Sequence, residues 1–251
     1  MPSASALRIH IERVLENRFP AALSPMPQTV RETAPVGIAE IDSLLSGGIP
    51  VGAICEIIGP STSGRTCLAL SFIAERTSEG KVCAWVDVSD ALDPESAAAS
   101  GVCLRQLLWV RCTRASAPAK GKPWSRLDQA LRAVDLLLQS GGFAAIVLDM
   151  GDIAAEHAAK IPLATWYRFR QAAEQSRGCL VVLGSEAYAQ SSADVVLECA
   201  PRGASSHTML QGYTFDVQLR RQRSSSAMGV MRKPPASTWT APNAWAAGAA
   251  S

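Results

Sequence analysis

The chain has 251 residues, of which 48% are hydrophobic and 18% are charged, and its formal net charge is +2. This length and composition suit one domain with tails, and they exclude wholesale disorder. The near-neutral charge also excludes a strong basic field that would hold nucleic acid by counterion release.

The first element expected is an amphipathic helix over residues 5–19, with Ser5 as a candidate N-cap. Its apolar side chains recur at helical spacing, and they are Leu7, Ile11, Val14, Leu15 and Phe19. Prolines then break the pattern, so residues 1–34 are interpreted as a helix and a linker. No apolar run fits a signal peptide or a membrane span, so we expect a cytoplasmic protein.

From residue 35 to residue 223, short apolar strands alternate with helices. The expected strands are 53–58, 82–88, 107–112, 144–150 and 179–184. Such strands predict an α/β fold with a mostly parallel, twisted sheet, helices on its faces and right-handed crossovers. Two later runs, 194–200 and 213–221, are expected to add antiparallel strands near the C-terminus.

Two segments are expected to lack regular structure. Residues 113–124 are polar and contain proline, which predicts a loop. Residues 224–251 are rich in Ser, Ala and Pro, which predicts a flexible C-terminal tail. Three domains or segments follow from this division: 1–34, the core 35–223, and 224–251.

The seven cysteines include no C-x-x-C pair, and only three histidines occur. A metal site is therefore not expected. Most of the cysteines lie in apolar runs, which indicates buried, reduced thiols.

The segment "GPSTSGRT" stands between an expected strand and an expected helix, as a phosphate-binding P-loop does. It comprises Gly59, Pro60, Ser61, Thr62, Ser63, Gly64, Arg65 and Thr66. Glycines let backbone N–H groups turn inward, and a helix N-terminus adds positive potential. Thr66 is placed to meet magnesium, and Asp149 ends an apolar strand as a Walker B aspartate does. Arg65 replaces the usual lysine, and this exchange is not conservative because the guanidinium is planar and bulkier.

The chain resembles bacterial RecA. The stretch 36–102 carries "G-x-x-x-I-D-x-L-L-x-G-G-I-P-x-G" before the P-loop and "VDVSDALDPESAAASGV" after it. The second segment is not shared by P-loop proteins in general. The resemblance covers roughly residues 5–223 and implies a RecA-like core.

At several positions where RecA has a residue that contacts or activates the nucleotide, this chain has a residue of a different chemical type. The catalytic glutamate of RecA matches Ser89, and the adenine-stacking tyrosine matches Ser96. The γ-phosphate-sensing glutamine lies where Ser185 and Glu186 stand. Together with Arg65, these replacements predict a pseudo-ATPase that is not an enzyme. It would have no catalytic residue and no required cofactor, and would retain at most residual binding of ATP and magnesium.

The segments that match the two DNA-binding loops of RecA are short here and lack a Gly-rich, basic composition. Weak or indirect DNA binding is therefore expected. Surfaces that meet another protomer look better preserved. The helix side chains Leu7, Ile11, Leu15 and Phe19 resemble the N-terminal helix of RecA, although the same pattern suits a helix packed on its own core.

Arg221 and Arg223 match two RecA cations that reach the ATP of the adjacent protomer, although a solvated strand end or a nucleic-acid patch would look alike. Trp239 and Trp245 are candidate interface anchors in the tail, or incidental residues there. This pattern is similar to the ImuA type of RecA-like proteins. It implies an accessory role in damage-induced mutagenic (translesion) DNA synthesis, through RecA, an ImuB-like polymerase partner, or both. An active RecA-like ATPase in recombination and a SulA-like cell-division inhibitor are the alternatives.

Overall fold

A computed structural model describes residues 14, 31–112, 125–151, 153–206, 210–223 and 234–242. The chain divides into two compact units, residues 1–31 and 32–251. In the first unit, Val14 is helical and 42% exposed. The other apolar residues of the predicted helix, Leu7, Ile11, Leu15 and Phe19, lie outside the described residues, as do the predicted loop 113–124 and Trp245.

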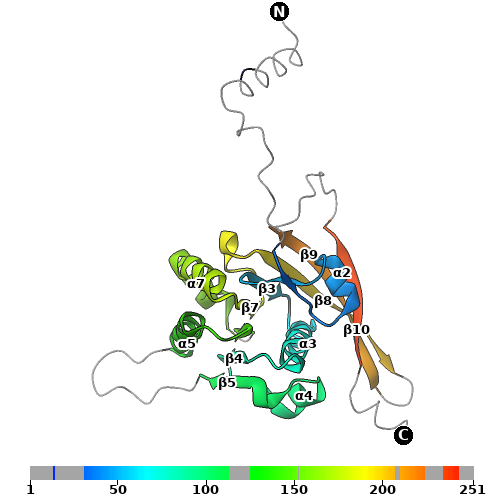
Figure 1. Cartoon of the computed structure of the whole chain (residues 1–251). Helices are drawn as coiled ribbons and strands as arrows, with labels where there is room; N and C mark the ends of the chain where they lie inside the picture. Colours follow the sequence, from blue (N-terminus) through cyan, green and yellow to red (C-terminus); the bar gives the residue numbers. More distant parts are fainter. Residues whose placement is uncertain are drawn as a thin grey trace, which may run out of the picture. The chain divides into compact units, whose positions relative to one another are not determined.

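The second unit is built on a twisted sheet with eight described strands (Figure 1). In spatial order these are β10 (Ala236–Pro242), β9 (Leu210–Gln222), β8 (Val195–Ser206), β3 (Ile54–Ile58), β7 (Cys179–Gly184), β6 (Ala145–Asp149), β4 (Cys83–Asp87) and β5 (Leu107–Arg111). A separate antiparallel pair consists of β1 (Thr33–Ala34) and β2 (Ile49–Pro50). The α/β fold with a mostly parallel sheet is thus confirmed.

Helices cover both faces of the sheet (Figure 1). The described helices are α2 (Ala39–Leu44), α3 (Arg65–Ser78), α4 (Pro94–Ala99), α5 (Arg126–Ser140), α6 (Ala155–Ala158) and α7 (Leu163–Ser176), with 3₁₀ turns η2 (Leu104–Gln106) and η3 (Gln190–Ser192). Alternate residues of each central strand join two separate apolar clusters, one with α3 and one with α5 and α7. This alternation follows from the strand period of two, and it explains why the central strands are apolar throughout.

Local sequence signals set several helix starts. Ser125 and Asp128 form a reciprocal capping box at the start of α5. Asp93 accepts N–H groups at the start of α4, where Pro94 takes the first helical position. In parallel strand–helix units, the carboxyl end of a strand lies beside the N-terminus of the helix that follows it. We call the end of the sheet where β3, β7 and β6 finish the carboxyl edge.

The C-terminal part differs from the sequence prediction in two ways. β8 was expected to be antiparallel to the core strands, but it runs parallel to β3, with Cys55 level with Val195. The antiparallel pairs of the large sheet are β8 with β9 and β9 with β10. The predicted flexible tail also contains β10, which pairs with β9 along its whole length, Trp239 opposite Phe215. The sheet therefore includes residues beyond 223, where the core was predicted to end.

Within the part of the chain that is described, no helix is both long and apolar enough to cross a membrane. The seven cysteines are free thiols, five of them buried. Burial raises the pKa of the Cys83 thiol to about 12 and that of Cys179 to about 11. Such thiols stay protonated and behave as small apolar side chains.

Candidate nucleotide site at the carboxyl edge

The phosphate loop follows β3 directly and is held by both neighbouring strands. The N–H of Gly59 donates to the carbonyl oxygen of Gly184, at the end of β7, with an N···O distance of 3.2 Å. A Cβ on Gly59 would lie 2.2 Å from the carbonyl oxygen of Cys199 in β8, and φ there is +147°. Only glycine fits this position, so the start of the loop is fixed by close backbone contact.

The loop enters α3 through Gly64, a left-handed N-cap with φ +85°. The first-turn N–H groups of a helix have no acceptor inside the helix, and they attract anions together with the helix dipole. Thr62 also has a positive φ, +64°, which is strained for a β-branched residue. The loop therefore has the backbone form of an anion site.

Arg65 begins α3 and lies near the Walker B aspartate. The position that a Cβ on Gly151 would take is 3.6 Å from Nη2 of Arg65 and 3.2 Å from Oδ1 of Asp149. Nη1 of Arg65 is buried, and no described residue accepts a hydrogen bond from it. A buried guanidinium N–H without an acceptor is costly, and a phosphate oxygen would supply that acceptor. The structure thus brings the predicted residues Arg65 and Asp149 together.

Thr66 and Asp149 fit a magnesium ion that arrives with a nucleotide. Thr66 is exposed on the first turn of α3, next to the loop. Asp149 ends β6, where its Oδ1 accepts the N–H of Gly151 at 3.0 Å. Hydroxyl and carboxylate oxygens are ligands that magnesium prefers. When bound, the ion would neutralise phosphate charge, while the loop N–H groups and Arg65 hold the phosphates.

Asp87 and Asp90 flank Ser89, and both carboxylates are engaged in other contacts. Asp87 is fully buried; it accepts two backbone N–H groups of the next turn and the indole N–H of Trp109 at 3.3 Å. Asp90 forms a bidentate pair with Arg111, at 2.6 and 2.7 Å, and this contact holds the pKa of Asp90 below its ordinary value. Neither side chain takes the place of the glutamate that Ser89 matches.

Ser96 and Ser185 are also engaged locally. Oγ of Ser96 donates to Oδ2 of Asp93 at 2.5 Å, as part of the cap of α4. Oγ of Ser185, just after β7, lies 3.0 Å from the hydroxyl of Tyr188. Glu186 is exposed. The side chains of Ser96 and Ser185 are thus engaged in local contacts.

The predicted interface residues lie in different settings. Arg221 and Arg223 are exposed at the end of β9. The backbone N–H of Arg223 donates to Asp194, whose own N–H donates to Ile54, so Arg223 is level with the start of β3. Trp239 was expected to be an exposed anchor, and this is wrong: it is only 6% exposed. Its ring packs on Phe215 because β10 carries it into the core of the sheet.

Sequence reasoning missed an aromatic stack beside the loop. The ring of Phe215 lies 2.7–2.9 Å from the position that a Cβ on Gly64 would take. Phe215 contacts Trp239, with ring centroids 5.2 Å apart, and Tyr213, with centroids 6.3 Å apart and an interplanar angle of 29°. The spacing "Y-x-F" in a strand puts both rings on one face, and this was the available signal.

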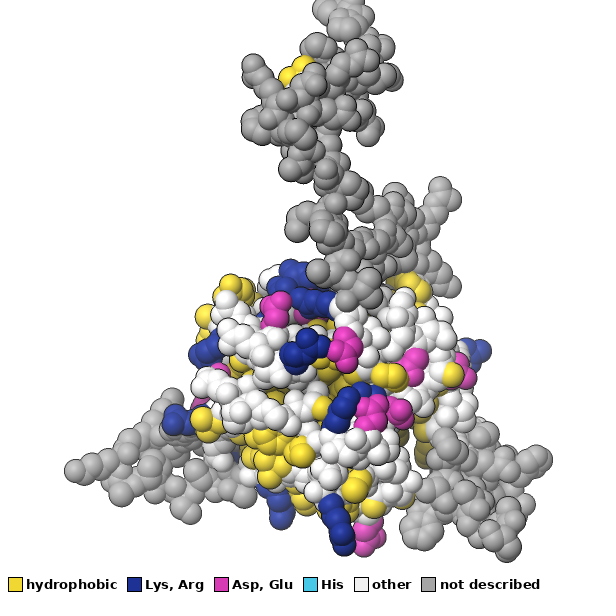
Figure 2. Space-filling view, viewed as in Figure 1, with side chains coloured by type: hydrophobic (Ala, Val, Ile, Leu, Met, Phe, Trp, Pro, Cys, Tyr) yellow, Lys and Arg dark blue, Asp and Glu magenta, His cyan; other side chains and the backbone are white. Residues whose placement is uncertain are grey.

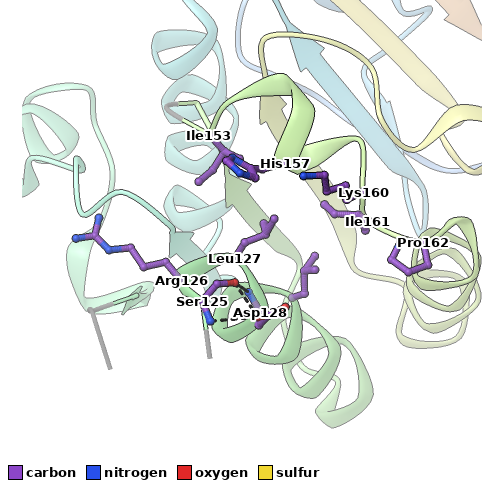
Figure 3. Close-up of a pocket in the computed structure, with 10 residues that line it drawn as sticks. Ser125, Arg126, Leu127, Asp128, Ile153, His157, Lys160, Ile161 and Pro162 are labelled. Carbon is purple, nitrogen blue, oxygen red and sulfur yellow. Dashed lines mark hydrogen bonds between the residues drawn. The ribbon is translucent and has the colours of Figure 1, made fainter. Parts of the chain in front are cut away.

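A cavity of about 410 Å³ opens between the start of α5 and residues 153–162 (Figure 3). Apolar Leu127 and Ile153 line it together with His157 and Lys160. The hydroxyl and N–H groups at the start of α5 are already bonded within the capping box, as Figure 3 shows. None of the residues that line this cavity belongs to the phosphate loop.

A strand–loop–helix phosphate cradle with an aspartate at the end of a parallel strand defines a P-loop protein of the α/β class. Comparison with known proteins gives the family. The model of the RecA N-terminal domain matches residues 10–162, more than half of the chain. The chain belongs to the RecA family.

Curated relatives match in part. RecA of Colwellia psychrerythraea is 42% identical over 119 residues, which is 47% of this chain and 31% of that protein. RecA of Brucella anthropi is 43% identical over 119 residues, 47% of this chain and 30% of that protein. The chain thus matches about a third of the length of these relatives. The crystal structure of the RadB recombinase shares the fold, with a TM-score of 0.56 and 16% identity over 82% of this chain and 94% of that one.

These comparisons correct the prediction that the chain is not an enzyme. The curated relatives are named RecA, and the similar structure is named a recombinase. The replaced residues therefore do not establish a pseudo-ATPase.

Proposed function

We propose that this RecA-family chain is a nucleotide-binding accessory protein of damage-induced mutagenic DNA synthesis in the cytoplasm. It binds RecA, an ImuB-like polymerase partner, or both. ATP with magnesium is the ligand of its phosphate loop. The specific role comes from the resemblance to the ImuA type, and the family membership is consistent with it.

The observation that carries this proposal is the position of Arg221 and Arg223. Arg221 is level with Glu56 in the middle of β3, and Arg223 with the start of that strand. The phosphate loop begins at the opposite end of β3, after Ile58. The backbones of both arginines therefore lie away from the phosphate loop along β3, and the guanidinium of Arg221 donates to the carbonyl oxygen of Gln190. Exposed guanidinium groups suit the carboxylates of a second protein, or the phosphates of a nucleotide bound to it.

The surface chemistry supports protein binding over direct DNA binding. Figure 2 shows basic and acidic side chains interspersed over the visible face of the described part of the chain. Several basic side chains of the described residues are paired, such as Arg168 with Asp135 at 2.9 Å and Arg202 with Asp216 at 3.0 Å. Phosphate backbones are held by clustered, unpaired cations. Contact with DNA is therefore weak or runs through the partner.

A RecA-like ATPase in recombination is the second candidate, and the family match favours it. The two differ in turnover and in partner. DNA-stimulated phosphate release that is lost in Arg65→Ala, together with strand exchange by the purified chain alone, favours the recombinase.

The accessory role is tested by capture experiments with the full chain. Purified protein is immobilised and exposed to RecA filaments on single-stranded DNA, and separately to the ImuB-like protein. The proposal expects saturable capture of at least one partner. A deletion of residues 1–19 shows whether the predicted N-terminal helix contributes. Capture of neither partner, with the protein shown to be folded, contradicts the proposal.

A further inference from the structure

The aromatic stack on β9 begins against the phosphate loop and ends on an open face. Phe215 touches Gly64 and is only 5% exposed, and Trp239 supports it from β10. Tyr213 stacks on Phe215 and is 50% exposed. The loop is thus continuous with an aromatic surface whose last ring is accessible.

The strands around Tyr213 leave its ring uncovered because the neighbouring residues are small. Its register partners are Ala204 in β8 and Ala241 in β10, and Gly212 precedes it. β8 reaches the end of β3 at Glu198 and then continues to Ser206. Tyr213 therefore stands on the part of the β8–β9 hairpin that extends past the carboxyl end of β3.

We propose that Tyr213 is the residue on which the base of the bound nucleotide stacks. The inference rests on the nucleotide binding given above as part of the proposed function. Phosphates held at Gly64 and Arg65 leave the ribose and base outside the loop. Tyr213 presents an open aromatic face one ring beyond Phe215, which itself touches Gly64. Ser96 has no ring, and its hydroxyl is bonded to Asp93.

The chemistry of such a site defines its ligand class. Stacking on an aromatic ring tolerates any base, because every base has a π-face, and purines offer the larger one. The site therefore takes nucleoside triphosphates, with purines bound more tightly than pyrimidines. The ionic cluster of Arg202, Asp216 and Thr238 uses alternate strand positions and so occupies the other face of the hairpin. This favours a mononucleotide anchored in the loop over a stretch of DNA.

The test separates the base from the phosphates. Wild-type protein and variants are titrated calorimetrically with the non-hydrolysable analogue AMP-PNP and with inorganic tripolyphosphate, both with magnesium. Tyr213→Ala should bind AMP-PNP about 10-fold more weakly, in the range of a lost base stack, and bind tripolyphosphate as the wild type does. Tyr213→Phe keeps the ring and should bind both normally. Tyr167→Ala is the matched control, since Tyr167 is 57% exposed on α7.

Three results would overturn this inference: no binding of AMP-PNP by the wild type, equal AMP-PNP affinity in Tyr213→Ala, or an equal loss of tripolyphosphate binding. Loss of oligonucleotide binding in Tyr213→Ala, with AMP-PNP binding intact, would also overturn it and assign the ring to DNA. Capture of RecA by the same proteins is measured separately. A chain that captures RecA without binding AMP-PNP keeps the accessory role and loses the base site. If Tyr213→Ala weakens AMP-PNP binding but the wild type does not capture RecA, the base site is kept and the accessory role through RecA is lost.

Discussion

The two ends of β9 present different chemistry on opposite faces of the sheet. At the carboxyl edge, Phe215 faces the apolar cluster around α3 and packs on the phosphate loop. At the other end, Arg221 donates to the carbonyl oxygen of Gln190, on the face that carries α7. A β-bulge at Arg220 separates them, because Leu219 pairs with Leu197 and Arg221 with Val196. One extra residue reverses the alternation of side chains beyond it.

This comparison teaches that one strand serves two surfaces that can be altered separately. About eight residues, or roughly 26 Å of extended chain, lie between Tyr213 and Arg221. Substitutions at such a separation usually have additive effects. We therefore expect nucleotide binding and partner binding to respond to different variants.

The largest effect is expected where the loop meets the sheet. Gly59→Ala should lower the free energy of unfolding by about 2–4 kcal/mol, because the new Cβ meets the carbonyl oxygen of Cys199 and φ is unfavourable. Gly203→Ala is the control, since its Cβ would meet no atom within 4 Å. Urea denaturation measures both. Equal stability of the two variants would show that the close contact at Gly59 is not present.

A smaller effect, confined to the nucleotide end, is expected at Arg65. Arg65→Ala should weaken AMP-PNP binding about 10- to 100-fold, because a charge-assisted contact to phosphate is lost. Stability should fall little, since Nη1 of Arg65 has no acceptor among the described residues. Arg126→Ala, at the start of α5, is the control for removing a positive charge. If Arg65→Ala binds AMP-PNP with unchanged affinity in calorimetry, Arg65 does not contact the phosphates.

The smallest effect is a pH dependence of stability that depends on Glu56, which is level with Arg221 in the sheet. Burial raises the pKa of this carboxyl, against backbone hydrogen bonds from Ala189 and Tyr188 and the charge of Arg221. The folded chain then holds a proton that the unfolded chain releases. Stability should therefore fall as the pH rises from about 4.5, the ordinary value of the carboxyl, through the raised pKa.

Glu56→Gln should remove this dependence, which unfolding curves at several pH values will measure. Glu174→Gln, on α7, is the control. A pH profile in Glu56→Gln that matches the wild type would assign the dependence to other groups.

Much of the core was predictable because its signals are local. Buried strands such as 179–184 read as continuous apolar runs, and Ser125 with Asp128 marks the start of α5. The phosphate loop was predictable for the same reason, since strand, glycines and helix follow one another in sequence. Arg65 and Asp149 were both predicted from the P-loop and Walker B patterns, and the structure places them near each other.

The remainder depended on contacts between distant segments. β10 lies in a Ser- and Pro-rich stretch, and only its pairing with β9 makes it a strand and buries Trp239. The bulge at Arg220 has no signal in the sequence, so the face that Arg221 adopts was not predictable. The packing of Phe215 on Gly64 joins residues far apart in the chain, and composition does not reveal it.

The most direct test of the account is an equilibrium titration of RecA filaments with the wild-type chain and the double variant Arg221→Ala/Arg223→Ala, each with saturating AMP-PNP. The account predicts about 10-fold weaker filament binding by the double variant, with unchanged affinity for AMP-PNP. Arg168→Ala, whose side chain is 55% exposed on α7, should bind filaments as the wild type does. Equal filament binding by the double variant and the wild type would contradict the account.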